Sequence, residues 1–262
     1  MKFDFIGKTV VITGGTSGIG KAVAAAFLKE GCYVAVCGRN PAKVDAVTET
    51  FDNERFFAMV ADATSVDQTN QFGDCIFERF GRVDVWINNA GLSDPMPFER
   101  ADETAFDRMV SANLKSAFFG SQTAARLMKK SRDVAENGVI INTSSFTSVI
   151  PTAGKALYGA TKAAVTNLTR ALAAELAADS IRVVSIVPGY ISTEMTEKNI
   201  AKNRDWLVSN IAERRLGNPE DMVGAYVFLA SDAAAYVTGT ELIVSGGKLC
   251  VQNPLWSWEA HS

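Results

Sequence analysis

Short apolar runs alternate with longer, helix-like segments along nearly the whole chain. Seven runs have the composition of strands buried on both faces, and they cover residues 10–12, 33–37, 56–61, 83–87, 138–142, 181–187 and 241–244. The segments between them predict helices at 21–30, 41–51, 65–80, 103–131, 156–178, 193–211 and 219–230; the fourth is either one long helix or two abutting ones. This alternation is typical of a doubly wound, Rossmann-like α/β fold with a seven-stranded parallel sheet.

The sequence pattern and the composition bound the number of domains and the possible partners. The pattern contains no linker, internal repeat or low-complexity tract, so residues 1–262 are expected to form a single domain. The net charge is −3 and no basic run occurs, which argues against a nucleic-acid partner. The N-terminus lacks an apolar signal core and no apolar run approaches membrane-spanning length, which favours a soluble cytoplasmic protein without a membrane partner.

Cysteine and histidine usage argues against several kinds of chemistry. The four cysteines, at positions 32, 37, 75 and 250, include no Cys-x-x-Cys pair and predict buried, reduced thiols. The only histidine is His261. A histidine base and the usual His/Cys zinc centre are therefore not expected, and neither is a bound metal.

The segment 10–20, VVITGGTSGIG, predicts a strand, a glycine-rich turn and the start of a helix. Such a turn offers bare backbone N–H groups and a positive helix end to a phosphate. A side chain at Gly14 would obstruct the turn, one at Gly18 would hold a pyrophosphate away, and one at Gly20 would push the helix off its strand. The spacing Gly-x-x-x-Gly-x-Gly by itself also fits an ordinary strand-to-helix turn.

The carboxyl ends of the other predicted strands carry unusual residues as well. They are Gly38 and Arg39, Asp62, the turn 88–91, Ser144 and Ser145, and Pro188 and Gly189. Because ligands of such sheets lie along the carboxyl ends of the strands, this convergence favours a dinucleotide site.

Arg39 decides which dinucleotide is expected. It stands where an NAD site usually has an acidic residue for the ribose 2′-hydroxyl, and a guanidinium can bind a 2′-phosphate instead. We therefore predict NADP rather than NAD; the alternative is that Arg39 is a solvated loop residue. Ser17 is neutral and adds no second cation. Asp62 either binds the adenine amino group or caps a turn.

Tyr158 and Lys162 are candidate reacting groups. Four residues apart on a helix, they share one face, although such a pair also fits a surface tyrosine on an amphipathic helix. Ser145 ends the strand before that helix and is expected at the same sheet edge.

The chain resembles the single-domain branch of the short-chain dehydrogenase/reductase family. The matching pieces are TGGTSGIG at 13–20, Asp62, NNAG at 88–91, Asn113, Ser145, YGATK at 158–162 and PGYIST at 188–193. The match extends from about residue 7 to residue 247. It implies an enzyme that moves a hydride between a nicotinamide cofactor and a CH–OH or C=O group.

The resemblance also implies a role for each reacting residue. Tyr158 is the acid in reduction and the base in oxidation, and Lys162 lowers the pKa of that phenol and holds the nicotinamide ribose. Ser145 binds the substrate carbonyl. Asn113 anchors a water for proton supply; a buried asparagine that ties down helix backbone is the alternative.

The full set of expected cofactor-binding residues follows from the motifs and the resemblance together. It comprises Gly14, Thr16, Ser17, Gly18, Ile19, Gly20, Arg39, Asp62, Asn89, Ala90, Gly91, Tyr158, Lys162, Pro188, Gly189, Ile191 and Thr193. The last two are expected at the carboxamide end of the cofactor, and the turn 89–91 is expected to support the sheet and line the cofactor.

Substrate choice is expected to depend on the loop 92–98, the residues after Ser145, and residues 194–216. These regions supply Met96, Phe146, Val149, Tyr190, Met195, Trp206, Leu207 and Ile211, which favours a hydrophobic, hydroxysteroid-like ketone or secondary alcohol. The alternative is that half of them are packing residues.

Three other functions resemble the predicted one in part. They are a 3-oxoacyl-thioester reductase of acyl carrier protein, an epimerase or dehydratase of the longer-chain branch, for which this chain lacks room, and a non-catalytic dinucleotide-binding regulator. The family implies a homo-oligomer, a dimer or tetramer, that pairs through the helices around 105–130 and 156–178. The tail 249–262, with Trp256 and Trp258, is expected to cover a neighbouring subunit.

Overall fold

The computed structural model describes residues 4–131 and 137–250, and the predicted tail beyond residue 250, with Trp256, Trp258 and His261, lies outside them. The strands are β1 (Thr9–Thr13), β2 (Tyr33–Gly38), β3 (Phe56–Val60), β4 (Val85–Asn88), β5 (Gly138–Thr143), β6 (Ile181–Pro188) and β7 (Glu241–Val244). They form one parallel sheet in the order β3-β2-β1-β4-β5-β6-β7. The predicted seven-stranded, doubly wound fold is confirmed.

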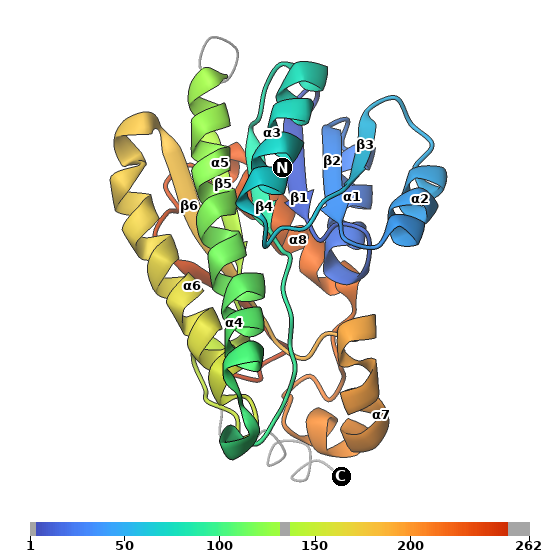
Figure 1. Ribbon diagram of the computed structural model, residues 1–262, viewed down its shortest axis with the longest axis vertical. Coiled ribbons are helices and arrows are strands. Elements are labelled where there is room, and N and C mark those ends of the chain that lie inside the picture. The colour runs from blue at the N-terminus through green and yellow to red at the C-terminus, as the bar shows by residue number, and fades with distance from the viewer. Residues whose placement is uncertain (1–3, 132–136, 251–262) are drawn as a thin grey trace.

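Helices cover both faces of this sheet (Figure 1). The α-helices of the described chain are α1 (Gly18–Lys29), α2 (Pro41–Thr50), α3 (Val66–Phe80), α4 (Glu103–Val110), α5 (Ser116–Lys130), α6 (Ala156–Glu175), α7 (Glu194–Ser209) and α8 (Pro219–Ala230). Helices α3, α5 and α6 lie on one face, and α1 and α8 pack together on the other. Helix α7 lies beyond one end of the sheet rather than on a face.

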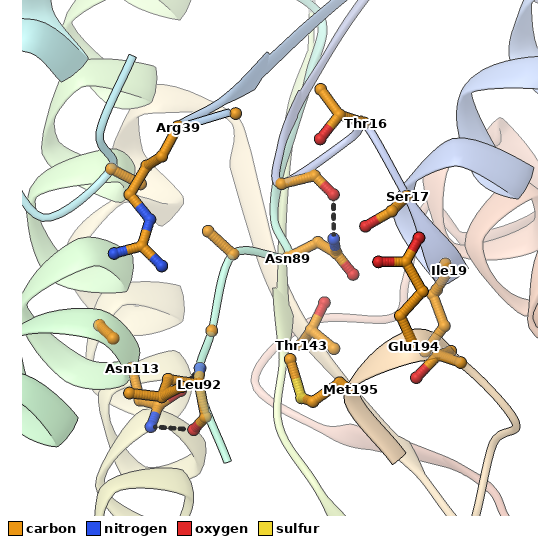
Figure 2. A pocket seen from close by; sticks show the side chains of 18 of the residues that line it. Thr16, Ser17, Ile19, Arg39, Asn89, Leu92, Asn113, Thr143, Glu194 and Met195 are labelled. Atoms are coloured by element: carbon orange, nitrogen blue, oxygen red, sulfur yellow. Dashed lines mark hydrogen bonds between the residues drawn. The ribbon is translucent and has the colours of Figure 1, made fainter. Parts of the chain in front are cut away.

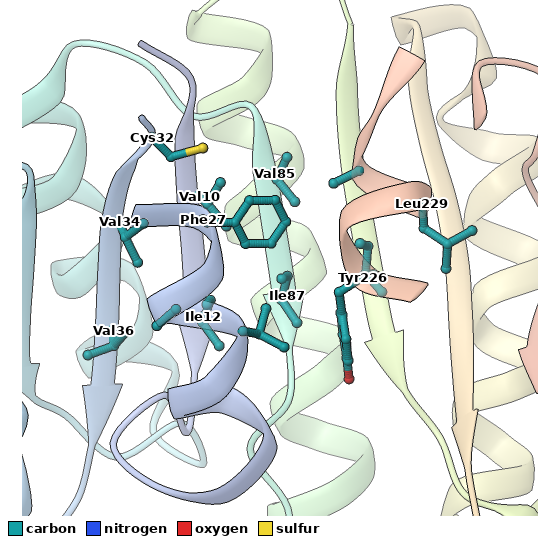
Figure 3. Packing of buried hydrophobic residues seen from close by; sticks show 14 of the residues in the cluster. Val10, Ile12, Phe27, Cys32, Val34, Val36, Val85, Ile87, Tyr226 and Leu229 are labelled. Atoms are coloured by element: carbon teal, nitrogen blue, oxygen red, sulfur yellow. The ribbon is translucent and has the colours of Figure 1, made fainter. Parts of the chain in front are cut away.

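Alternate residues of each strand enter two separate cores. Val10 and Ile12 of β1 pack beneath Phe27 of α1 and Tyr226 of α8 (Figure 3). Val11, between them, faces the α3/α5 layer. Because side chains of a strand alternate between faces, a strand covered on both sides must be apolar at every position, which is why these strands appear as unbroken apolar runs.

Several predicted boundaries shift for local reasons. The fourth strand begins at Val85 instead of residue 83, because the Val83 N–H donates to the Ser131 hydroxyl (2.9 Å) rather than to a neighbouring strand. The helix predicted over 156–178 ends at Glu175, and a short 3₁₀ turn, Ala177–Asp179, follows. The segment 103–131 is one continuous helical path in which a π-helical turn, Ser111–Lys115, joins α4 to α5.

The order of the strands creates the site. The chain leaves β1 toward β2 and β3, then returns to add β4 on the other side of β1. The connections that follow β1 and β4 therefore diverge, and they leave a crevice at the carboxyl ends of these two strands.

Three further observations concern expectations drawn from the composition and the sequence. Cys32 and Cys37 are buried, whereas Cys250 is exposed, and all four cysteines are free thiols. Across residues 4–131 and 137–250, no group of three His, Cys, Asp or Glu side chains could hold a metal ion. Over the same residues, no helix is both long and apolar enough to cross a membrane.

Candidate active site

The glycine turn between β1 and α1 is packed tightly against the turn after β4. Gly14 has a positive φ of 66°, and a Cβ there would lie 3.0 Å from the Cα of Ala90. A Cβ on Gly20 would overlap the Gly14 carbonyl oxygen and lie 2.7 Å from the Asn89 Nδ2. Only glycine fits either position, as the sequence predicts for the turn and for the contact of helix with strand.

The turn 89–91 holds the glycine turn in place. The Asn89 side-chain amide donates to the carbonyl oxygens of Thr13 (3.2 Å) and Gly14 (3.1 Å). Figure 2 draws the second of these hydrogen bonds as a dashed line at Asn89. The Thr13 hydroxyl accepts the backbone N–H groups of Asn89 and Ala90, both at 3.1 Å. The polar residues of this turn thus fix the backbone of the crevice floor.

A cleft of about 410 Å³ runs along the carboxyl ends of the strands. Of the residues predicted from the sequence to bind cofactor or to react, all line it except Gly20, which lies beneath the turn. Figure 2 shows Arg39 on one side of this cleft, with Ser17 and Glu194 on the other. The structure therefore brings the carboxyl end of β2 and the start of α7 to the same opening of the cleft.

Tyr158 and Ser145 meet at the inner end of the cleft. Burial raises the pKa of the Tyr158 phenol above its ordinary value, and a hydrogen bond with Ser145 opposes that rise. The Ser145 hydroxyl oxygen accepts from the Thr147 backbone N–H (3.3 Å) and hydroxyl (3.0 Å). These two donors occupy its acceptor positions and direct its own proton elsewhere.

Lys162 lies one helical turn beyond Tyr158 and is buried. Its Nζ donates to the Thr143 carbonyl oxygen (2.8 Å) and lies 5.9 Å from the centroid of the Tyr158 ring. Burial lowers the pKa of Lys162 to about 8. The resemblance implies that Lys162 lowers the pKa of Tyr158, and that role stays a prediction, because in the structure burial dominates and raises the pKa of the phenol. Burial penalises the charged form of both groups, and the ammonium contacts the ring instead of the phenol oxygen.

Asn113 lies in the π-helical turn, and its side chain is fully engaged by the loop after β4. Its amide nitrogen donates to the Leu92 carbonyl oxygen (2.9 Å), and its amide oxygen accepts the Leu92 N–H (3.0 Å; Figure 2). A Cβ on Gly91 would lie 2.8 Å from that amide oxygen and 3.4 Å from the Lys162 Nζ. This side chain ties down the backbone of a loop, and not that of a helix as the alternative interpretation holds.

Asp62 and Arg39 lie at the opposite end of the cleft from Tyr158. One Asp62 carboxylate oxygen accepts the Thr64 N–H (2.9 Å), so this side chain caps a turn. Arg39 is exposed, and no ion pair engages it within residues 4–131 and 137–250. Its guanidinium is available to an anion in the cleft.

Sequence reasoning missed an ion pair that crosses the opening of the cleft. Lys43 of α2 pairs with Glu194, the first residue of α7, and both line the cleft. The spacing of four between Arg39 and Lys43 was a usable signal for a second cation. No local signal points to Glu194, because it lies 151 residues away along the chain.

The start of α7 is fixed by a reciprocal cap. The Thr193 N–H donates to the Thr196 hydroxyl oxygen (2.9 Å), and that hydroxyl donates to the Ile191 carbonyl oxygen (2.7 Å). This cap holds residues 191–196 against the cleft, which they line in part.

Seven of the eight residues expected to select the substrate divide into two groups, and the eighth, Met96, is half-buried. Phe146, Tyr190, Leu207 and Ile211 are buried together in one small apolar cluster. Val149, Met195 and Trp206 are instead 49%, 53% and 59% exposed. Half of the eight are thus packing residues, as the alternative interpretation holds.

Comparison with known proteins places the chain in a family. A family model described as short chain dehydrogenase matches residues 8–204. A 3-oxoacyl-acyl-carrier-protein reductase of Thermotoga maritima is 35% identical over 243 residues, which are 92% of this chain and 97% of that protein. A 3α-hydroxysteroid dehydrogenase of Mediterraneibacter gnavus is 36% identical over 243 residues, 91% and 96% of the two chains.

A solved structure agrees with these relatives. The 3-ketoacyl-(acyl-carrier-protein) reductase of Brucella melitensis, in complex with NADH, has a TM-score of 0.87 and 31% identity, and the match covers 93% of this chain and 98% of that one. The chain belongs to the short-chain dehydrogenase family and is an oxidoreductase.

Proposed function

We propose that the protein is an NADPH-dependent reductase that interconverts a ketone and a secondary alcohol. The observation that carries the proposal is the meeting of Ser145, Tyr158 and Lys162 in the same cleft as the glycine turn and Arg39. In the reduction, a ketone, NADPH and one proton give a secondary alcohol and NADP⁺.

The residues of the cleft fit the two halves of that reaction. When bound, the dinucleotide supplies the hydride that forms the new C–H bond at the carbonyl carbon. Ser145 donates a hydrogen bond to the carbonyl oxygen, and Tyr158 gives its proton to that oxygen. The raised pKa of Tyr158 keeps the phenol protonated at neutral pH, which suits an acid. The Lys162 ammonium, one turn away, then stabilises the phenolate.

The preference for NADPH rests on charge at the outer end of the cleft. Arg39 has no carboxylate partner among the described residues, and its fork of donors matches a phosphate. Lys43 lines the same cleft, but its charge is already paired with Glu194, so it does not replace the cation that Ser17 lacks. An unpaired guanidinium and no acidic residue at the end of β2 favour a 2′-phosphate over a free hydroxyl.

The apolar side chain of Met195, which is 53% exposed and lines the cleft, supports a substrate with an apolar body. The relative named for a hydroxysteroid is consistent with such a substrate. The relative named for a 3-oxoacyl-acyl-carrier-protein substrate supports a second candidate, the reduction of a 3-oxoacyl thioester. Turnover of an acyl-carrier-bound 3-oxo thioester, compared with a free steroid ketone, separates the two.

The test of the proposed function is NADPH oxidation followed at the nicotinamide absorbance, with a panel of ketones, for wild type and Tyr158→Phe. Loss of a general acid lowers the rate by about 10²- to 10⁴-fold. Tyr236→Phe is a matched control, because Tyr236 is fully exposed and lines no part of the cleft. Undiminished turnover by Tyr158→Phe, or tight NADPH binding with no turnover of any ketone, would contradict the proposal.

A further inference from the structure

A second lysine contacts the ring of Tyr158. Lys155 immediately precedes α6, and its Nζ lies 6.0 Å from the centroid of the Tyr158 ring and 5.9 Å from that of the Tyr190 ring. The ammonium therefore lies between the proposed acid and an aromatic residue beside the predicted substrate region. Tyr190 in turn packs against Phe146, with ring centroids 4.6 Å apart, and both side chains are buried. The Tyr190 ring that Lys155 contacts is therefore held in place by packing.

Lys155 is a partly buried cation without a carboxylate partner among the described residues. Lys8 and Lys43 each pair with an acidic residue, whereas no ion pair engages Lys155 within residues 4–131 and 137–250. Burial lowers its pKa, which indicates an ammonium that has lost water without gaining an anion. Cation–π contacts compensate only part of that loss.

The acidic residues nearest to Lys155 do not neutralise it. Asp94 and Glu99 line the same cavity as Lys155. The Asp94 carboxylate is already paired with Arg108, and Glu99 lies beyond ion-pair distance of Lys155. The position beside Lys155 is thus open to a carboxylate that the described residues do not supply.

The space beside Lys155 is largely apolar. A cavity of about 590 Å³ lies between the loop after β4 and the start of α6, and Tyr158 lines both this cavity and the cofactor cleft. Its remaining walls are mainly apolar and include Met96, Phe98, Ala101, Phe106, Leu157 and Ala160. A ligand that approaches Tyr158 through this cavity contacts mainly apolar side chains, and Lys155 is the cation that lines the cavity.

We propose that Lys155 binds a carboxylate of the substrate, so that the substrate is an oxo acid with an apolar chain and not a neutral ketone. The inference rests on the proposed function, since it assigns a substrate class to the same site. An ammonium–carboxylate hydrogen bond in a partly desolvated site is worth about 1.5–3 kcal/mol, which corresponds to roughly ten- to a hundredfold in affinity.

The test compares oxo acids with their methyl esters, which keep the chain and remove the charge. The probes are 4-oxopentanoate, 5-oxohexanoate and 6-oxoheptanoate and the three esters. Each is titrated by calorimetry into enzyme saturated with NADP⁺, where no hydride is available and binding is measured without reaction. We expect at least one acid to bind about tenfold or more tightly than its ester in wild type.

Substitutions then assign the preference to one side chain. The acid-to-ester ratio falls to about one in Lys155→Met and is kept in Lys155→Arg; Lys155→Gln serves if the methionine variant does not fold. Lys29→Met is the matched control, because it removes the same charge from an exposed position at the end of α1 that lines neither cavity, and it keeps the ratio.

The outcomes separate this inference from the proposed function. Equal binding of every acid and its ester, or a preference that survives Lys155→Met, overturns the carboxylate site even if NADPH reduces the esters. A preference that depends on Lys155, with no NADPH oxidation by any of the six probes, supports the carboxylate site and counts against a reductase of these ketones.

Discussion

The preference for NADPH over NADH can be tested at Arg39. Substitution by alanine removes the guanidinium at the end of β2 and leaves the backbone of that loop unchanged. Arg39 is exposed and carries no ion pair within the described residues, so its loss breaks no salt bridge there. The effect of Arg39→Ala should therefore appear in cofactor selection rather than in stability.

The magnitude follows from the kind of contact and its exposure. A hydrogen bond to a charged group contributes about 1.5–3 kcal/mol, and solvent screening of an exposed guanidinium favours the lower end of that range. Because about 1.4 kcal/mol corresponds to a tenfold change, we expect Arg39→Ala to lower kcat/KM for NADPH about tenfold. The value for NADH should hardly change. Lys43 remains in the cleft, which is why the preference falls without inverting.

The assay is the kcat/KM for each dinucleotide at a fixed ketone concentration, at low and at physiological salt. Arg204→Ala is the control, since Arg204 is exposed on α7 and lines neither cavity. Equal loss for NADPH and NADH would show that Arg39 supports the loop instead of the 2′-phosphate. An unchanged NADPH value would show that it is a solvated loop residue.

Four further predictions concern other parts of the site and the fold. Ketone reduction should slow as the pH rises through about 8, where Lys162 loses its charge, and a rate–pH profile of kcat checks this. Glu194→Gln removes a carboxylate from the cleft and frees Lys43, so KM for NADPH should fall more than KM for NADH; a fall shared equally would argue against the pair's role. Gly20→Ala should lower the free energy of unfolding by about 1–3 kcal/mol, as denaturant titration would show, because its Cβ overlaps the Gly14 carbonyl. We propose that the chain forms a homo-oligomer through α5 and α6; Phe118→Glu, at a 44% exposed position of α5, should then shift sedimentation toward the monomer, and a wild-type monomer would contradict this.

The sheet could be predicted because its physics is local. A parallel strand covered on both faces is apolar at most positions, so β1 and β2 stand out by the unbroken apolar runs at 10–12 and 34–37. The glycines at 14 and 20 could be predicted as well, since a positive φ favours glycine at the first and the close backbone contact leaves no room for a Cβ at the second. Polar residues directly after such strands must then share one edge of the sheet, which gave the position of Ser145.

Other features depend on contacts between segments that are remote in the chain. No periodicity in the sequence predicts the ion pair of Lys43 with Glu194. The same holds for the position of Lys155 between two tyrosine rings. Each contact depends on how distant segments pack. The hydrogen bonds of Asn113 to Leu92 depend likewise on the path of the loop after β4.

The sequence by itself determined the elements, the sheet edge at which the cleft lies and the candidates for the reacting side chains. Only the tertiary structure decided the pKa values and the solvent exposure of these side chains. Burial raises the pKa of Tyr158 and lowers that of Lys162, since the charged form of each loses water whichever charge it bears. Tertiary packing also divided the apolar residues near the cleft into buried supports, such as Phe146, and exposed ones, such as Trp206. Residue type is written in the sequence, whereas solvent exposure and electrostatic environment arise only when distant segments pack together.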